Sequence, residues 1–112
     1  MAIQEKMLNQ SHPDGTSTSS VYTPATNTTA IIKNIMVCNV TGSALTFDIH
    51  VTDDGLTGGD ANAIFKSAPI KANETISVDS FIAIQGDGTR DLQIRASAGN
   101  ALTFSFFGAE IT

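Results

Sequence analysis

The sequence contains few of the residues that define several common classes of protein. It has one cysteine and no tryptophan, and charged residues occupy only 15% of its 112 positions. A single cysteine, Cys38, cannot form an internal disulfide, so a disulfide scaffold is excluded. No apolar run approaches the roughly 18 residues of a membrane-spanning helix, and Met1–Ser20 is too polar for a signal-peptide core. We therefore expect a protein of the cytoplasm in which it is made, or of a particle assembled there.

Positive charge is also scarce. Six Lys and Arg residues stand against eleven Asp and Glu residues, which gives a formal net charge of −5. Six scattered cations cannot neutralise a run of phosphates, the interaction that dominates nucleic-acid affinity. They also form no polybasic cluster that an anionic membrane surface would attract. The sequence therefore predicts that neither nucleic acid nor a membrane is a partner.

The abundant residues are those of strands and turns. The chain has 14 Thr, 10 Ser, 7 Asn and 9 Gly, together with many Ile, Val and Phe residues. Such a composition favours β-structure. The length suits one domain, because domains usually contain about 100–150 residues.

Apolar periodicity predicts about eight short strands. In the expected strand Ala44–Val51, apolar and polar residues alternate without a fault from Leu45 through the following Thr52, which indicates one buried and one solvated face. Ala30–Val40 is apolar on both faces, as in a central strand, and Thr41-Gly42-Ser43 would join the two strands as an antiparallel hairpin. Regular short strands indicate a sandwich or small barrel, and we predict an all-β, antiparallel β-sandwich that is jelly-roll-like or Ig-like. The remaining expected strands are Val21–Thr23, Ala63–Lys66 (ended by Pro69), Glu74–Val78, Phe81–Ile84, Asp91–Ser97 and Ala101–Glu110.

The first twenty residues differ from the rest of the chain in composition. Their only apolar side chains larger than alanine are Ile3, Met7 and Leu8. Such a segment buries too little surface to order alone, so we predict an extended arm over 1–20 beside a sandwich over 21–112. The arm is either disordered or ordered against a partner through those three residues. Its removal is expected to leave the fold intact.

Phe107 is a further candidate for a subunit contact. Phe106 and Phe107 are adjacent in an expected strand, so their side chains must point to opposite faces. If Phe106 lies in the core with Leu102 and Phe104, Phe107 is exposed on a Thr- and Ser-rich face. The alternative is that the chain itself covers this face.

Candidate chemistry is sparse. His12 lies in the arm, and His50 is expected on the solvated face of its strand beside Asp48, so neither has a partner set for catalysis. Cys38 lies in the most apolar strand, where a buried thiol is unreactive. The sequence therefore predicts a protein that is not an enzyme and has no cofactor.

One loop is a weak candidate for calcium. Asp53–Asn62 contains three glycines and three aspartates, and Asp53, Asp54 and Asp60 could supply oxygen ligands. The loop lacks the ligand spacing and bidentate Glu of an EF-hand. The competing interpretation is a long turn in which Gly and Asp satisfy the backbone.

Three segments resemble a pattern of small virion proteins of tailed bacteriophages. They are Thr29–Val51 (TAIIKNIMVCNVTGSALTFDIHV), Ile70–Ile76 (IKANETI) and Ile94–Ala101 (IRASAGNA), and the resemblance extends over about Val21–Ile111. It implies a structural subunit with a β-sandwich fold and no catalytic site.

On that basis we expect a virion structural protein. The leading hypothesis is a capsid decoration (cement) protein, a trimer that binds the major capsid protein or other virion subunits on the outer shell. The alternative is a tail, collar or fibre-adaptor subunit. A Ca²⁺-dependent carbohydrate-binding module is a third option, against which the missing tryptophan argues.

Overall fold

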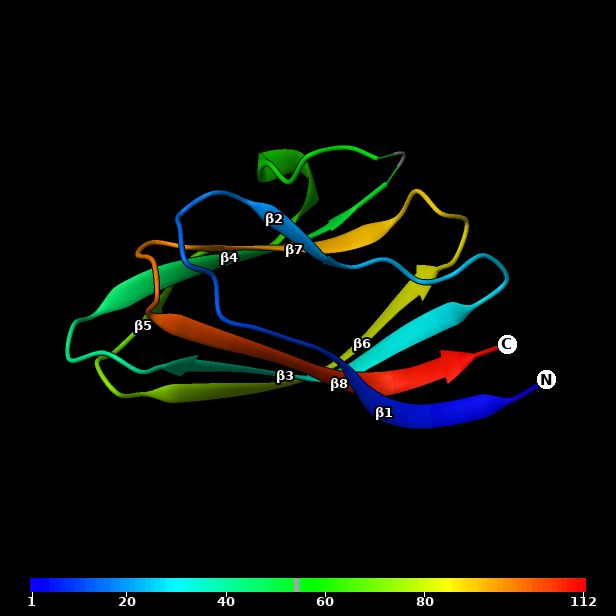
Figure 1. Cartoon of the computed structure of the whole chain (residues 1–112), viewed down its shortest axis with the longest axis horizontal. Helices are drawn as coiled ribbons and strands as arrows, with labels where there is room; N and C mark the ends of the chain where they lie inside the picture. The colour runs from blue at the N-terminus through cyan, green and yellow to red at the C-terminus, as the bar shows by residue number, and fades with distance from the viewer. Residues whose placement is uncertain (54) are drawn as a thin grey trace.

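The computed structural model describes residues 1–53 and 55–112 and arranges eight strands in two stacked sheets (Figure 1). The first sheet contains, in order, β1 (Ile3–Ser11), β8 (Leu102–Ile111), β3 (Thr29–Asn39) and β6 (Thr75–Gln85). The second contains β2 (Ser19–Tyr22), β7 (Asp91–Ala96), β4 (Leu45–Thr52) and β5 (Ala63–Ile70). A single 3₁₀ turn, η1 (Asp60–Asn62), precedes β5.

The connections define a jelly roll. Every connection between consecutive strands crosses from one sheet to the other, except that β4 and β5 are neighbours in the second sheet. All strand pairs are antiparallel. Two four-stranded antiparallel sheets joined in this way form a jelly roll. The predicted all-β sandwich is confirmed, and of its two predicted variants the jelly roll is the one observed.

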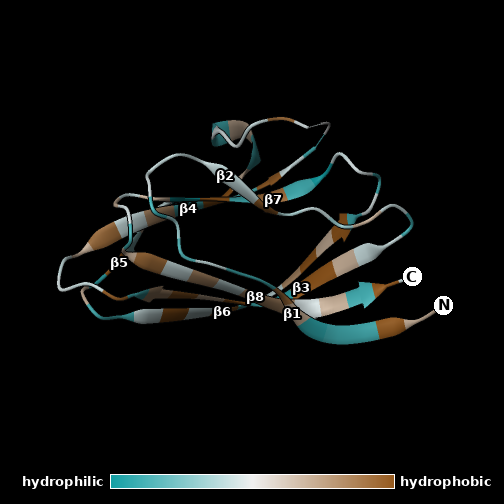
Figure 2. Cartoon of the chain, viewed as in Figure 1, coloured by the Kyte–Doolittle hydropathy of each residue, from teal (hydrophilic) through white to brown (hydrophobic). Residues whose placement is uncertain are grey.

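The core lies between the sheets because each strand turns alternate side chains inward, an alternation visible as banding in Figure 2. The Phe47 ring of β4 meets the Phe104 ring of β8 edge-on, with centroids 5.9 Å apart. Burial of large apolar side chains from both sheets is the main stabilising contribution of such a sandwich. The largest fully buried apolar side chains are Phe104, Phe106, Ile32, Ile35, Ile49, Ile70, Ile84, Leu92, Ile94, Leu102 and Val37.

The N-terminal segment does not form the predicted extended arm. Ile3–Ser11 is strand β1, which pairs along β8, and Ala2 and Thr112 exchange backbone hydrogen bonds of 3.0 and 2.9 Å. Leu8 turns into the core. Backbone pairing and one inward leucine compensate for the polar composition of this segment, and they cover the edge that β8 would otherwise expose. Because β2 begins at Ser19, the predicted boundary at residue 20 falls inside a strand.

The predicted hairpin of β3 and β4 is also wrong, since the two strands lie in different sheets. The buried Asn39 side chain directs the chain between them. Its Nδ2 donates to the carbonyl of Ser43 at 2.7 Å and to that of Lys71 at 3.1 Å, while its Oδ1 accepts from the Thr41 amide at 3.0 Å. These bonds fold the turn against the connection between β5 and β6 instead of closing a hairpin.

Two strand boundaries differ for simple reasons. β5 continues through Pro69 to Ile70, which is possible because β5 is an edge strand and needs no donor on its free side. The two strands expected around Asp79 and Ser80 are one continuous strand, β6, with a bulge opposite Lys33. The structure therefore has the predicted total of eight strands for a different reason. It has one strand that was not predicted, β1, and two predicted strands are joined in β6.

Deleting residues 1–11 is expected to unfold the domain, contrary to the expectation for a detached arm. The deletion exposes the backbone of β8 and removes Leu8, and loss of one buried leucine side chain alone costs about 2–5 kcal/mol. Thermal denaturation followed by circular dichroism measures the effect, with deletion of residues 1–2 as the control. An unchanged melting temperature in the longer deletion would contradict the role of β1.

Phe47→Ala is expected to lower the free energy of unfolding by about 3–5 kcal/mol, because it opens a cavity between the sheets. Urea denaturation measures the loss. Leu56→Ala is the matched control, since Leu56 is 58% exposed and its truncation should change stability by less than about 0.5 kcal/mol. Equal losses in the two variants would contradict the assigned core.

Candidate functional site

The polar face of β4, expected to be solvated, is buried. Asp48, His50 and Thr52 are 4%, 2% and 1% exposed. The connection between β4 and β5, of which residues 53 and 55–62 are described, folds back over the second sheet and covers part of this face (Figure 1). Buried polar groups are stable only when they are hydrogen-bonded, so the covering loop has to satisfy them.

Gln93 of β7 holds the first part of this loop. Its Nε2 donates to the carbonyl of Leu56 at 3.0 Å, and its Oε1 accepts from the Gly58 amide at 2.7 Å. The same Nε2 lies 3.2 Å from the Asp91 carboxylate, which also accepts a hydrogen bond from the Thr52 hydroxyl. Gln93 is therefore the residue that fixes this part of the loop to the sheet.

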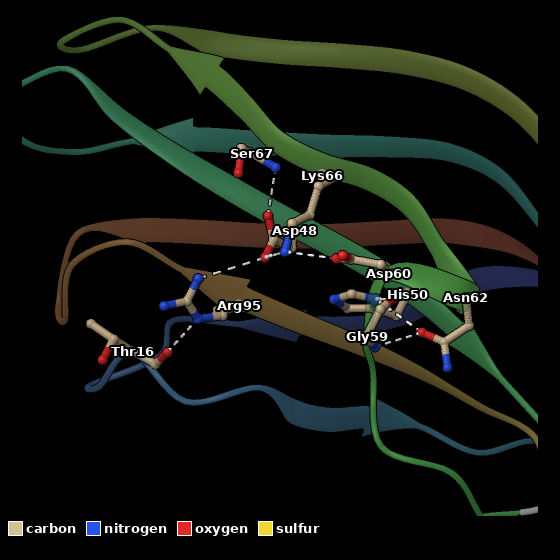
Figure 3. A network of polar contacts seen from close by, with 9 residues as sticks. All are labelled: Thr16, Asp48, His50, Gly59, Asp60, Asn62, Lys66, Ser67 and Arg95. Atoms are coloured by element: carbon tan, nitrogen blue, oxygen red, sulfur yellow. Dashed lines mark hydrogen bonds and ion pairs between the residues drawn. The ribbon is translucent and has the colours of Figure 1, made fainter.

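His50 holds the second part of the loop (Figure 3). Its Nδ1 lies 3.1 Å from both the Gly59 carbonyl oxygen and Asn62 Oδ1. Both are acceptors, so Nδ1 carries the proton. Gly58 lies against the imidazole ring, and an ideal Cβ at that position would be 2.7 Å from His50 Cδ2. The histidine thus acts as a tether for the loop.

Asp48 connects three parts of the second sheet (Figure 3). Its Oδ1 accepts from the Ser67 amide at 2.6 Å, and its Oδ2 lies 3.7 Å from Arg95 Nη1 and 3.9 Å from Lys66 Nζ. Ser67 has a φ of 49°, so β5 bends at the point where its amide turns to Asp48. Arg95 Nε in turn donates to the Thr16 carbonyl at 2.9 Å. This carboxylate therefore links β4, β5, β7 and the segment before β2.

A second polar contact joins the two sheets near the chain termini. The Glu110 carboxylate of β8 accepts a hydrogen bond from the Tyr22 hydroxyl of β2 and pairs with Lys6 Nζ at 2.8 Å. The hydrogen bond from Lys6 lowers the pKa of Glu110, and burial raises that of Tyr22. Because the pKa of Glu110 is lowered on folding, its stabilising contribution is present above the ordinary carboxyl pKa and is lost as the pH falls.

The structure describes two of the three predicted calcium residues, and each of the two is paired with a cationic side chain. Asp53 pairs with Arg90 at 3.2 Å, Asp60 pairs with Lys66 at 3.2 Å, and Asp54 lies outside the described residues. Across residues 1–53 and 55–112, no group of three or more His, Cys, Asp or Glu side chains is placed to hold a metal ion. The same part of the chain contains no pocket, and no helix in it is long and apolar enough to cross a membrane.

The outer face of the first sheet has the opposite character. Ile3 and Met7 on β1 are 62% and 50% exposed, and Met36 on β3 is 40% exposed. Phe107 on β8 lies between them, opposite Met7 in the β1–β8 ladder. Paired residues point to the same side of a sheet, so these four residues form one surface, here called the outer apolar face. Glu5 and Lys33 form an ion pair on the same face.

Three of the four predicted contact residues lie on this face. Ile3 and Met7 are exposed there, and Phe107 is half-buried between neighbouring strands. Leu8 instead lies in the core and is not available to a partner. Sequence reasoning missed Met36, although the period-two pattern of β3 places it on the face opposite the buried Ile35 and Val37.

The comparisons with known proteins identify the class of fold. No protein-family model matches the sequence, and no curated protein matches it. Solved structures of infectious bursal disease virus are similar to the chain. A chain of its T13 viral particle has a TM-score of 0.55 at 11% identity. The match covers 97% of the present chain and 30% of the viral chain. A chain of the Gx strain has a TM-score of 0.54 at 15% identity, with 97% and 32% covered.

A chain of the VP2 subviral particle of the same virus has a TM-score of 0.52 at 15% identity. The present chain spans about a third of the length of these viral chains, since it covers 31% of this one. At such low identity the likeness shows the fold alone. The chain is thus an all-β jelly roll of the kind that those virus structures contain.

Gln93→Ala is expected to release the loop from the second sheet. The change leaves the Gly58 amide and the Leu56 carbonyl without their partner, which costs about 1–3 kcal/mol when both groups stay buried. Hydrogen exchange at the Gly58 amide should accelerate, and urea denaturation should show lower stability. Gln85→Ala, at an exposed position, is the control. Unchanged exchange at Gly58 would contradict the role of Gln93.

Proposed function

We propose that this chain is a structural subunit of a virus particle. The observation that carries the proposal is the outer apolar face, on which Ile3, Met7 and Met36 are largely exposed beside Phe107. Large apolar side chains gathered on one exposed surface mark an interaction site, because covering them removes apolar area from water. The similarity in fold to chains of a virus particle and a subviral particle supports this class of function.

The rest of the molecule suits a packing role. In the described residues there is no pocket for a small ligand, and the buried His50 and Asp48 are occupied in holding the loop and the edge strand. Residues 55–62 cover part of the second sheet. The first sheet has the larger set of exposed apolar side chains for contact with protein neighbours, and we assign no catalytic activity to the chain.

Within this class we propose a capsid decoration (cement) protein of a tailed bacteriophage. The support is the resemblance of Thr29–Val51, Ile70–Ile76 and Ile94–Ala101 to small virion proteins of such phages. The outer apolar face would bind the major capsid protein on the outer shell, in a virion assembled in the host cytoplasm. A trimer would place three such faces on the shell together and gain avidity without a strong single contact.

A tail, collar or fibre-adaptor subunit is the second candidate. The observation in its favour is the loop over 53–62, which is tethered by Gln93 and His50 while Leu56 stays 58% exposed. A fixed loop with an apolar side chain at its surface is suited to contact a neighbour or a receptor at one defined point. Immunogold electron microscopy of purified particles separates the two candidates, since a decoration protein labels heads and an adaptor labels tails.

Met7→Lys is expected to weaken binding to particles by about tenfold or more, because it places a charge in an apolar contact. Co-sedimentation with purified particles stripped of the native protein measures binding. Val40→Lys is the matched control, since Val40 is 54% exposed but lies in the turn after β3. Equal binding of the two variants would contradict the assigned face, and absence of binding by the unchanged protein would contradict the function.

A further inference from the structure

The two sheets end in four edge strands, β1 and β6 in the first sheet and β2 and β5 in the second. Each edge strand has a row of backbone amides and carbonyls without a partner strand. Such a row can pair with another extended chain, and proteins usually protect it with short strands, proline, bulges or charge.

Three of the edges are protected. β2 contains only four residues. β5 contains Pro69 and Lys66 and is bent at Ser67, where φ is 49°. β1 has Glu5 and Lys6 at its centre, and a register shift beside Leu8 interrupts its ladder. Each of these features disfavours addition of another strand.

β6 is much less protected. It is eleven residues long, contains no proline, lysine or arginine, and carries one charge, at Asp79. Its ladder with β3 also has a register shift, at Ser80 and Phe81 opposite Lys33, but the alternation of exposed and less exposed residues continues through this point. Phe81, near the middle of the strand, is 75% exposed, more than any other aromatic side chain in the described residues. A long, nearly uncharged edge with an exposed ring is suited to pairing.

We propose that β6 pairs with β6 of a second copy of this chain, antiparallel about a two-fold axis, to form a continuous eight-stranded sheet. An occupant of this edge must offer extended backbone with free hydrogen-bonding groups, and β6 itself offers them. A two-fold contact needs only one self-complementary patch, which is the commonest symmetry of protein oligomers.

The sequence of β6 is self-complementary when Phe81 lies opposite Phe81 of the second copy. Asp79 then faces Ala83, so the two like charges are not opposed, and Ser77 faces Gln85. On the inner side Val78 faces Ile84, which extends the core across the contact. Directly opposed side chains in an antiparallel pair have Cβ atoms about 4.5–5.5 Å apart, so the two rings would touch.

This pairing is independent of the proposed virion function. The β6 edge is a property of the jelly roll. Phe81 points to the same outer side of the first sheet as Met36, but it lies on the edge strand, and the pairing depends on the backbone groups of β6. If the chain forms trimers, the contact joins two trimers; if it is monomeric, it forms dimers.

Disulfide cross-linking of the full chain tests the contact. Phe81→Cys, in a Cys38→Ser background, is expected to form a disulfide-linked dimer under mild oxidation, because the two introduced thiols lie opposite each other. Leu56→Cys in the same background is the matched control, since Leu56 is 58% exposed on the loop over the second sheet. Non-reducing electrophoresis measures the dimer. Equal cross-linking at the two positions would overturn the proposal.

Light scattering provides a second measurement that does not depend on an exact register. Phe81→Lys is expected to halve the average mass of the particles in solution, whereas Leu56→Lys should leave it unchanged. Circular dichroism verifies that both variants fold. A mass unaffected by Phe81→Lys would overturn the pairing of two copies. The same result is expected if the β6 edge binds a different protein, so that case would also overturn the proposal. Particle binding measured in parallel distinguishes this failure from failure of the virion function.

Discussion

The rest of the structure depends on how the polar face of β4 is removed from water. Asp48, His50 and Thr52 would cost free energy if they were buried without partners. The loop over 53–62 and the neighbouring strands supply those partners through the Gln93 side chain, the Gly59 carbonyl and the Ser67 amide. The hydrogen bonds therefore fix a segment that is otherwise rich in glycine and aspartate, and they turn the second sheet into a closed surface.

Closure of one sheet makes the molecule asymmetric. Among the described residues, Ile3, Met7, Met36 and Phe81 are exposed on the first sheet, whereas the second sheet and its loop expose Ile64 and Leu56. A chain with a net charge of −5 can approach copies of itself most easily through such weakly charged surfaces. The second sheet is thus partly covered by the chain itself, whereas the outer side of the first sheet is suited to contact with neighbouring proteins.

The sequence pattern predicted the fold class and most of the core. Leu102, Phe104 and Phe106 lie where the period-two alternation placed them, because side-chain direction in a strand follows directly from sequence position. The pattern did not reveal which strands share a sheet. That choice depends on long-range contacts such as those of Asn39 with the Lys71 carbonyl, which no local periodicity encodes.

The main errors concern segments whose environment is set by distant residues. β1 is polar and resembles an arm, yet its backbone pairs with β8, about a hundred positions away in the sequence. The polar residues of β4 alternate as they would on a solvated strand, and they are buried only because a later loop returns over them. For the candidate site, the sequence named Ile3, Met7 and Phe107 as contact residues, but their position on one face of the sheet follows only from the register of β1 on β8.

The pairing of Ala2 with Thr112 has a consequence for how this jelly roll can be combined with other domains. The two ends of the chain leave the sheet side by side (Figure 1). A domain with adjacent ends can be inserted into a surface loop of a host protein with little disturbance, or its ends can be joined and the chain opened elsewhere. A larger polypeptide can therefore contain this fold as a domain inserted at a single position on its surface.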